Sequence, residues 1–163
     1  MTSLLAVVNV AQLRHPLSHQ RMAGFVDGID IINRLAEASP GFVWRGKGVA
    51  GHAALLPVGA GELFVNVSLW MSYRDFHAFT YAGAHGRYLT ARAQWFVPIP
   101  GSTTALWWTS GEVRSLEVDD ALTRLELLRR DGPSPRAFSV LRQWDAAGQP
   151  IRHHPRTRRP GYR

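Results

Sequence analysis

A tyrosine and a histidine stand four residues apart in the second half of the sequence, at Tyr81 and His85. Residues at this spacing share one face of an α-helix, and Tyr88 and Arg92 continue that face. Histidine is the side chain best suited to proton transfer near neutral pH, and its imidazole also binds metals and haem. The pair is therefore a candidate catalytic site. The alternative is a histidine at a helix end, with Tyr81 packed in the core.

A second candidate lies in the clearest strand of the sequence, residues 62–70. One face of this strand is wholly aliphatic, whereas the other carries Phe64, Asn66, Ser68 and Trp70. Burying Asn66 and Ser68 without partners would cost roughly 1–3 kcal/mol each. An apolar wall with a few directional polar groups is what a small-molecule pocket requires. Bonds to loop backbone or to water remain the alternative for both polar side chains.

Several kinds of site are excluded by composition or spacing. The chain has no cysteine, so thiolate metal sites, iron–sulfur clusters and cysteine nucleophiles are impossible. The glycine-rich run 46–51 lacks the Gly-Lys-Ser/Thr ending of a phosphate-binding loop. The remaining histidines show no metal-ligand spacing; they are His15, His19, His52, His77, His153 and His154. We therefore predict no protein-bound metal.

The elements that must position these groups follow from hydrophobic periodicity. Strands are predicted over 4–13, 42–45, 62–70 and 103–109, and helices over 21–38, 72–96 (with a break near 82–86) and 118–130. This β-α-β-β-α-β order, with an extra C-terminal helix, predicts a single α+β domain of ferredoxin-like topology. Neither face of the 62–70 strand has the composition of a solvated surface. We therefore expect one face of the sheet to be buried in a homodimer.

The net charge of +7 is concentrated at one end of the chain. Five arginines lie in residues 152–163, and the rest of the chain carries a formal charge of +2. A folded domain over 1–140 and a basic, disordered tail over 141–163 are therefore predicted. Nucleic-acid binding by a nearly neutral domain is not expected. No apolar run is long enough to span a membrane, and the N-terminus lacks the features of a secretory signal, so the cytoplasm is the expected location.

Many short segments resemble one known family in order and spacing. They include Phe64–Ser72 with Phe76, Phe79, Tyr81 and His85, then Arg92, Trp95–Phe96, Leu106–Trp108 and Gly132–Phe138, and earlier Arg21–Phe25 and Ala36–Trp44. Over residues 4–139 the chain resembles the family called domain of unknown function 3291. That family is similar to the dimeric α/β-barrel superfamily, in which two ferredoxin-like sheets pack into a barrel.

The resemblance implies three possible functions. The superfamily includes cofactor-free monooxygenases, which favours oxygenation of a planar or aromatic compound. Asn9, Asn66 and Ser68 would then orient the substrate, Trp70 and Phe79 would wall it, and His85 would transfer protons near Tyr81. The superfamily also includes haem-degrading enzymes, in which an Asn of the first strand and a His of a helix contact haem. This implies haem as an alternative cofactor, bound by His85. The interval from Phe79 to His85 is shorter in this sequence than the corresponding interval in the haem enzymes. A non-catalytic dimeric binding module is the third possibility.

Overall fold

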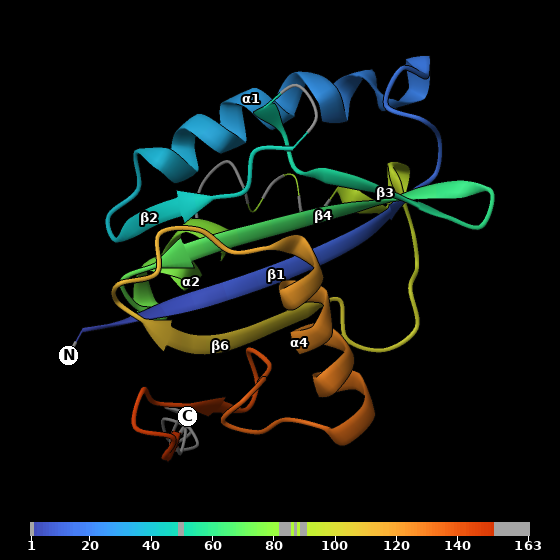
Figure 1. Ribbon diagram of the computed structural model, residues 1–163. Helices are drawn as coiled ribbons and strands as arrows, with labels where there is room; N and C mark the ends of the chain where they lie inside the picture. The colour runs from blue at the N-terminus through green and yellow to red at the C-terminus, as the bar shows by residue number, and fades with distance from the viewer. Residues whose placement is uncertain (1, 49–50, 82–85, 87, 89–90, 152–163) are drawn as a thin grey trace, which may run out of the picture.

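A six-stranded antiparallel sheet forms the centre of the protein, with α1 and α2 on one face and α4 on the other (Figure 1). The structure is a computed structural model in which residues 2–48, 51–81, 86, 88 and 91–151 are described. The strands are β1 (Ser3–Leu13), β2 (Phe42–Arg45), β3 (Ala54–Val58), β4 (Gly61–Trp70), β5 (Phe96–Val97) and β6 (Thr104–Ser110). The helices are α1 (Ala23–Glu37), α2 (Tyr73–Tyr81) and α4 (Val118–Asp131), with 3-10 turns η1 (Gln20–Met22) and η3 (Arg92–Gln94).

The strand order confirms the predicted ferredoxin-like topology. β1 and β4 are antiparallel neighbours in the middle of the sheet. β6 and the short β5 pair with the other edge of β1, whereas β2 and β3 pair with the outer edge of β4. The main strands therefore lie in the order β2-β4-β1-β6, with each helical connection crossing between strands that are not neighbours.

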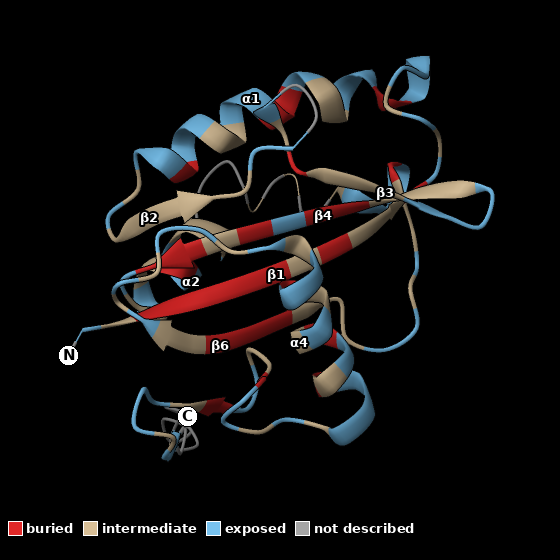
Figure 2. Cartoon of the chain, viewed as in Figure 1, coloured by how far each residue is buried: buried red, intermediate tan, exposed pale blue. Residues whose placement is uncertain are grey.

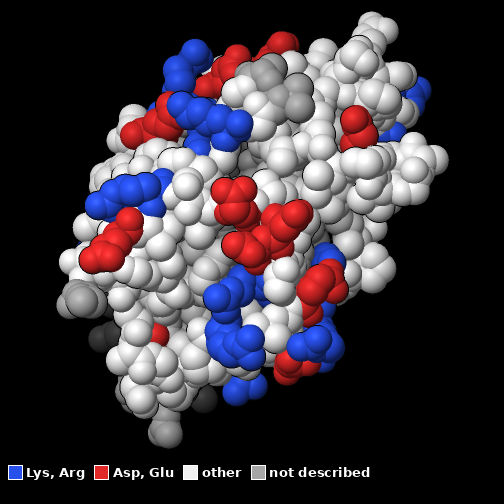
Figure 3. Space-filling model, viewed as in Figure 1, with Lys and Arg blue, Asp and Glu red and all other residues white. Residues whose placement is uncertain are grey.

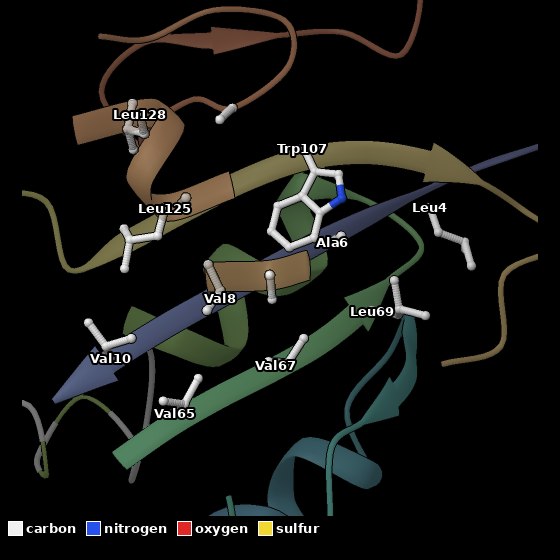
Figure 4. Packing of buried hydrophobic residues seen from close by; sticks show 13 residues of the cluster. Leu4, Ala6, Val8, Val10, Val65, Val67, Leu69, Trp107, Leu125 and Leu128 are labelled. Atoms are coloured by element: carbon white, nitrogen blue, oxygen red, sulfur yellow. The ribbon is translucent and has the colours of Figure 1, made fainter. Parts of the chain in front are cut away.

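The two faces of the sheet differ as the alternation in β4 predicts. One face carries an aliphatic cluster from β1 and β4, joined by Trp107 of β6 and by Leu125 and Leu128 of α4 (Figure 4). Trp107 lies beside its cross-strand partner Ala6, and the guanidinium of Arg124 lies 5.8 Å from the Trp107 ring centroid. The opposite face carries Phe64 and Trp70 and packs with residues of α1 and α2.

α4 covers the aliphatic face within a single chain. Val8, Val67 and Leu69 are at most 3% exposed. α4 crosses one end of the central strands in Figure 2, and Val113 and Leu116 of the segment before α4 pack against the same cluster. The dimer was predicted because this face needs cover, and α4 supplies that cover. The homodimer stays a prediction, but the aliphatic face no longer requires it.

Residues 141–151 differ from the predicted disordered tail. β7 (Gln143–Trp144) and β8 (Pro150–Ile151) form a small hairpin below β6 (Figure 1). The indole nitrogen of Trp108 donates a hydrogen bond of 2.7 Å to the Trp144 carbonyl, and the Trp144 ring packs on Phe138. The expectation of disorder, and with it the boundary at residue 140, is wrong for 141–151 because these aromatic contacts tie the hairpin to the domain. Residues 152–163 lie outside the described part.

The predicted helix over 72–96 agrees with the structure over most of its described residues. α2 covers Tyr73–Tyr81, and Gly86, Tyr88 and Ala91 are also helical. The prediction is wrong at its end, where a 3-10 turn covers Arg92–Gln94 and Phe96 begins β5. Residues 46–61, predicted as a loop or loosely paired edge, include β3, which forms a hairpin with β4. Its turn uses Gly59 at φ +58°, a left-handed conformation that glycine adopts without a Cβ clash.

The start of α2 is fixed by a side-chain cap at Ser72. The Ser72 hydroxyl accepts a hydrogen bond of 3.1 Å from the Asp75 backbone N–H and donates one of 2.6 Å to the Asp75 carboxylate. Replacing Ser72 with Ala is expected to lower the free energy of unfolding by about 1 kcal/mol, as measured by urea denaturation. Ser115→Ala, in an exposed segment without regular structure, is the matched control. Equal stabilities of the two variants would show that the cap contributes nothing.

The surface bears out the near-neutral charge of the folded part. On the face shown in Figure 3, acidic and basic side chains lie interspersed and form no continuous basic stripe among the described residues. In the described part of the chain, no helix combines the length and the hydropathy that crossing a bilayer requires.

Candidate functional site

A cavity of about 710 Å³ lies between the mixed face of the sheet and the helices on that side. Its floor comes from alternate residues of β1 and β4, and its walls come from α1, α2 and the segment that leads from η3 to β6. Pockets for small organic molecules typically measure roughly 300–1,000 Å³. The cavity is therefore large enough for a ligand with several rings.

The floor places two predicted asparagines side by side. Asn9 and Asn66 are direct cross-strand partners in the β1–β4 register. The side-chain nitrogen of Asn9 donates a hydrogen bond of 2.8 Å to the Thr104 hydroxyl, which fixes the amide and leaves its carbonyl oxygen available. The Asn66 side chain makes no hydrogen bond to a described residue and is exposed to the cavity. Asn66 thus has both an amide donor and an acceptor free for a ligand.

Ser68 and Trp70 continue the floor along β4. The Trp70 indole nitrogen donates a hydrogen bond of 3.0 Å to the Ser68 hydroxyl, so the Trp70 N–H and the Ser68 hydroxyl are hydrogen-bonded to each other within the protein. Trp70 is only 1% exposed and stacks on Phe79 of α2, with ring centroids 5.3 Å apart. Phe79 therefore lies between α2 and the sheet and lines the cavity, and its role as a wall for a substrate stays a prediction.

Tyr81, at the end of α2, also lines the cavity and is 50% exposed. Its ring lies 4.7 Å from that of His77, one turn earlier on the helix. Burial raises the pKa of Tyr73, one further turn back, and the nearby Tyr81 adds to this rise. His85 lies outside the described residues, so the predicted pairing of Tyr81 with His85 stays a prediction.

The four described histidines, His15, His19, His52 and His77, are not among the residues that line the cavity. The rings of His15 and His19 stack with centroids 4.3 Å apart, and desolvation together with the nearby His19, Arg21 and Arg14 lowers the pKa of His15. The imidazole of His52 lies 3.6 Å from the Asp30 carboxylate. No group of three metal-ligating side chains gathers among the described residues.

The described lining does not fit haem. It contains no His, Cys or Met, the side chains that most often ligate haem iron. The only histidine proposed as an axial ligand, His85, is not among the described residues. We therefore derive no chemistry through haem.

The sequence match extends over nearly the whole described chain. Residues 4–154 match the family described as domain of unknown function DUF3291. The chain belongs to this family. The DUF3291 match continues past residue 139, where the resemblance was expected to end, and includes the β7–β8 hairpin.

Solved structures similar to this DUF3291 member have low identity. SnoaB, a cofactor-independent oxygenase from Streptomyces nogalater, is 15% identical with a TM-score of 0.42, over 72% of this chain and 100% of SnoaB. A mutant of SnoaB is 14% identical with a TM-score of 0.43, over 70% of this chain and 98% of the mutant. A protein of unknown function from Nitrosomonas europaea is 13% identical with a TM-score of 0.44, over 71% of this chain and 96% of that protein. These values are too low to transfer an activity. No curated protein matches the sequence.

Sequence reasoning missed how much of the DUF3291 cavity comes from α1 and from arginines. Phe25, Ile29 and Ile32 of α1 line it, and the Tyr88 ring lies so close to α1 that a Cβ at Gly28 would overlap it. The helical spacing of these α1 residues was visible in the sequence but indicated only a core face. Arginines from three separate segments also line the cavity; they are Arg14, Arg45 and Arg92.

Proposed function

We propose that this protein is a small-molecule enzyme that binds a planar, aromatic compound in the cavity and oxygenates it without a cofactor. The observation that carries the proposal is the free Asn66 amide on the floor of an otherwise largely apolar cavity. Because the Asn66 amide is exposed and makes no hydrogen bond to a described residue, a ligand in the cavity can bond to its donor and its acceptor, and these directional bonds give orientation and specificity.

The described residues have separate roles in this proposal. Asn66 and the carbonyl oxygen of Asn9 orient polar substituents of the ring, and the Ser68 hydroxyl lies one step along β4. Phe79, stacked on Trp70, forms an aromatic wall of the cavity beside which a flat ring can lie. Tyr81 lies at the end of α2, next to the segment that contains His85, the proposed proton-transfer residue.

Oxygenation is the reaction class that best suits such a site. A hydroxylated, electron-rich ring that has lost a proton can itself reduce dioxygen: one oxygen atom enters the ring, which is oxidised to a quinone, and the other leaves as water with the protons that the ring gives up. The protein need only orient the ring, accept and return a proton and limit water. None of these steps requires a metal ligand. The choice of oxygenation rests on the family resemblance and is the part of the proposal that activity measurements must decide.

The test is oxygen consumption with a panel of hydroxylated two- and three-ring aromatic compounds. Asn66→Ala is expected to reduce the rate for the compound that is turned over by roughly 100-fold, the size of effect seen when one positioning hydrogen bond is lost. Gln94→Ala, an exposed amide outside the cavity lining, is the matched control. No oxygen uptake with any compound would overturn oxygenation, and an unchanged rate in Asn66→Ala would remove Asn66 from the site.

A homodimer is a separate proposal carried by the family resemblance. Sedimentation of the purified chain distinguishes a monomer of 18.2 kDa from a particle of twice that mass. Because α4 covers the aliphatic face, a dimer would have to use another surface.

A further inference from the structure

The charges around the cavity are all of one sign. Arg14, Arg45 and Arg92 line it, and no Asp or Glu is among its described lining residues. In the sequence, residues 49–50 and 82–90, which include positions that the structure does not describe, contain no Asp or Glu. The described lining therefore contains three cations and no carboxylate.

One of the three arginines is already paired. The Arg45 guanidinium lies 3.0 Å from the Glu37 carboxylate and donates a hydrogen bond of 2.8 Å to the Gly51 carbonyl. Its side chain is only 15% exposed, so this ion pair is held in a partly buried place. Arg45 is therefore a structural cation, and its charge is compensated without a ligand.

The other two arginines differ from Arg45 in this respect. The Nε of Arg14 donates a hydrogen bond of 2.9 Å to the carbonyl of Ala93, the residue next to Arg92. This bond fixes the guanidinium beside η3 and leaves its two terminal nitrogens free. Neither Arg14 nor Arg92 forms an ion pair with a described acidic residue. We call Arg14 and Arg92 the arginine pair.

The distance along the chain from Asn9 to Arg14, which directly follows β1, shows how far the arginine pair lies from the floor of the cavity. Arg14 is five residues beyond Asn9, and a strand rises about 3.3 Å per residue, so the two Cα atoms are roughly 16 Å apart. The long Arg side chain covers part of that distance. A ligand that contacts both the asparagine floor and the arginine pair must therefore be an extended molecule of about two or three fused rings with an acidic group at one end.

We propose that the ligand is a planar aromatic acid whose carboxylate binds the arginine pair while its rings lie over Asn9 and Asn66. This inference rests on the proposed function and names the class of its substrate. Arginine suits a carboxylate because its planar guanidinium donates two parallel hydrogen bonds to it. Cations at the mouth of a low-dielectric cavity also concentrate anions there before they bind.

The test compares acids with their neutral amides, which have the same shape. Binding of benzoate, 2-naphthoate and anthracene-2-carboxylate is measured by calorimetry beside that of the three matching carboxamides. We expect at least one of the larger acids to bind roughly tenfold more tightly than its amide, a difference typical of a hydrogen bond to a charged group. This preference is expected to fall as salt is raised.

Variants show whether the arginine pair causes the preference. Arg92→Gln and Arg14→Gln are each expected to weaken binding of the acid roughly tenfold and to leave binding of the amide unchanged. The Arg92 side chain makes no hydrogen bond to a described residue, and the bond that the Trp95 N–H donates to the Arg92 carbonyl involves only backbone atoms, so the replacement removes no described hydrogen bond. Arg34→Gln removes the same charge from an exposed position on α1 outside the cavity lining and is the matched control.

The outcomes separate this inference from the proposed function. Equal binding of acid and amide, weakened for both by Asn66→Ala, would overturn the aromatic acid and keep the cavity as a binding site. An acid preference that survives in both arginine variants would overturn the role of the arginine pair. Absence of binding by all six compounds would overturn the ligand class proposed here, whereas the oxygen-uptake test would still decide the proposed function.

Discussion

Replacing Val67 with Asn is expected to lower the free energy of unfolding by about 3–5 kcal/mol. Val67 is 3% exposed on the aliphatic face and lies opposite Val8 in the β1–β4 register. The substitution removes a buried aliphatic side chain and places an amide where the surrounding cluster offers only hydrocarbon. Urea denaturation monitored by circular dichroism measures the difference.

The neighbouring position provides a matched control for this prediction. Asn66→Val makes the reverse exchange on the opposite face, where the side chain is exposed to the cavity and has no described hydrogen bond to lose. Because valine also favours strands, its effect on stability is expected to stay within about 1 kcal/mol. Similar losses in the two variants would contradict the assignment of the two faces.

The parts of the fold that depend on local period were predictable. The alternation in β4 assigns Val65 and Val67 to one face and Asn66 and Ser68 to the other, and the clusters follow this division. Trp107 and Trp108, consecutive residues of β6, lie in different clusters. Period-2 patterning carries this information because a one-residue shift would turn every side chain over.

The parts that depend on long-range packing were not predictable. The sequence predicted the helix that forms α4, but the spacing of its apolar residues does not tell which face of the sheet it covers. The dimer was inferred because no element of the chain had been assigned to cover that face. The arginine pair joins residues 78 positions apart, at 14 and 92, and no local pattern brings them to one cavity. Basic composition likewise masked the hairpin at 141–151, because its contacts come from Trp108 and Phe138 upstream.

Ending the chain at Val140 is expected to lower the free energy of unfolding by about 2–4 kcal/mol relative to a chain that ends at Ile151. The shorter chain loses the packing of Trp144 on Phe138 and the hydrogen bond from the Trp108 indole nitrogen to the Trp144 carbonyl. It also loses Gln143, which is 4% exposed and donates a hydrogen bond of 2.8 Å to the Val140 carbonyl.

The chain that ends at Ile151 distinguishes the loss of stability caused by removing the hairpin from any effect of removing residues 152–163. It keeps the hairpin contacts described above and removes only residues 152–163, so its stability is expected to match that of the full chain within about 0.5 kcal/mol. If the cavity carries the function, this shorter chain also keeps full ligand binding. A partner held by the five arginines would instead be lost at this first truncation, before the hairpin is touched. Equal stability of the chains ending at 140 and 151 would show that the hairpin does not support the core.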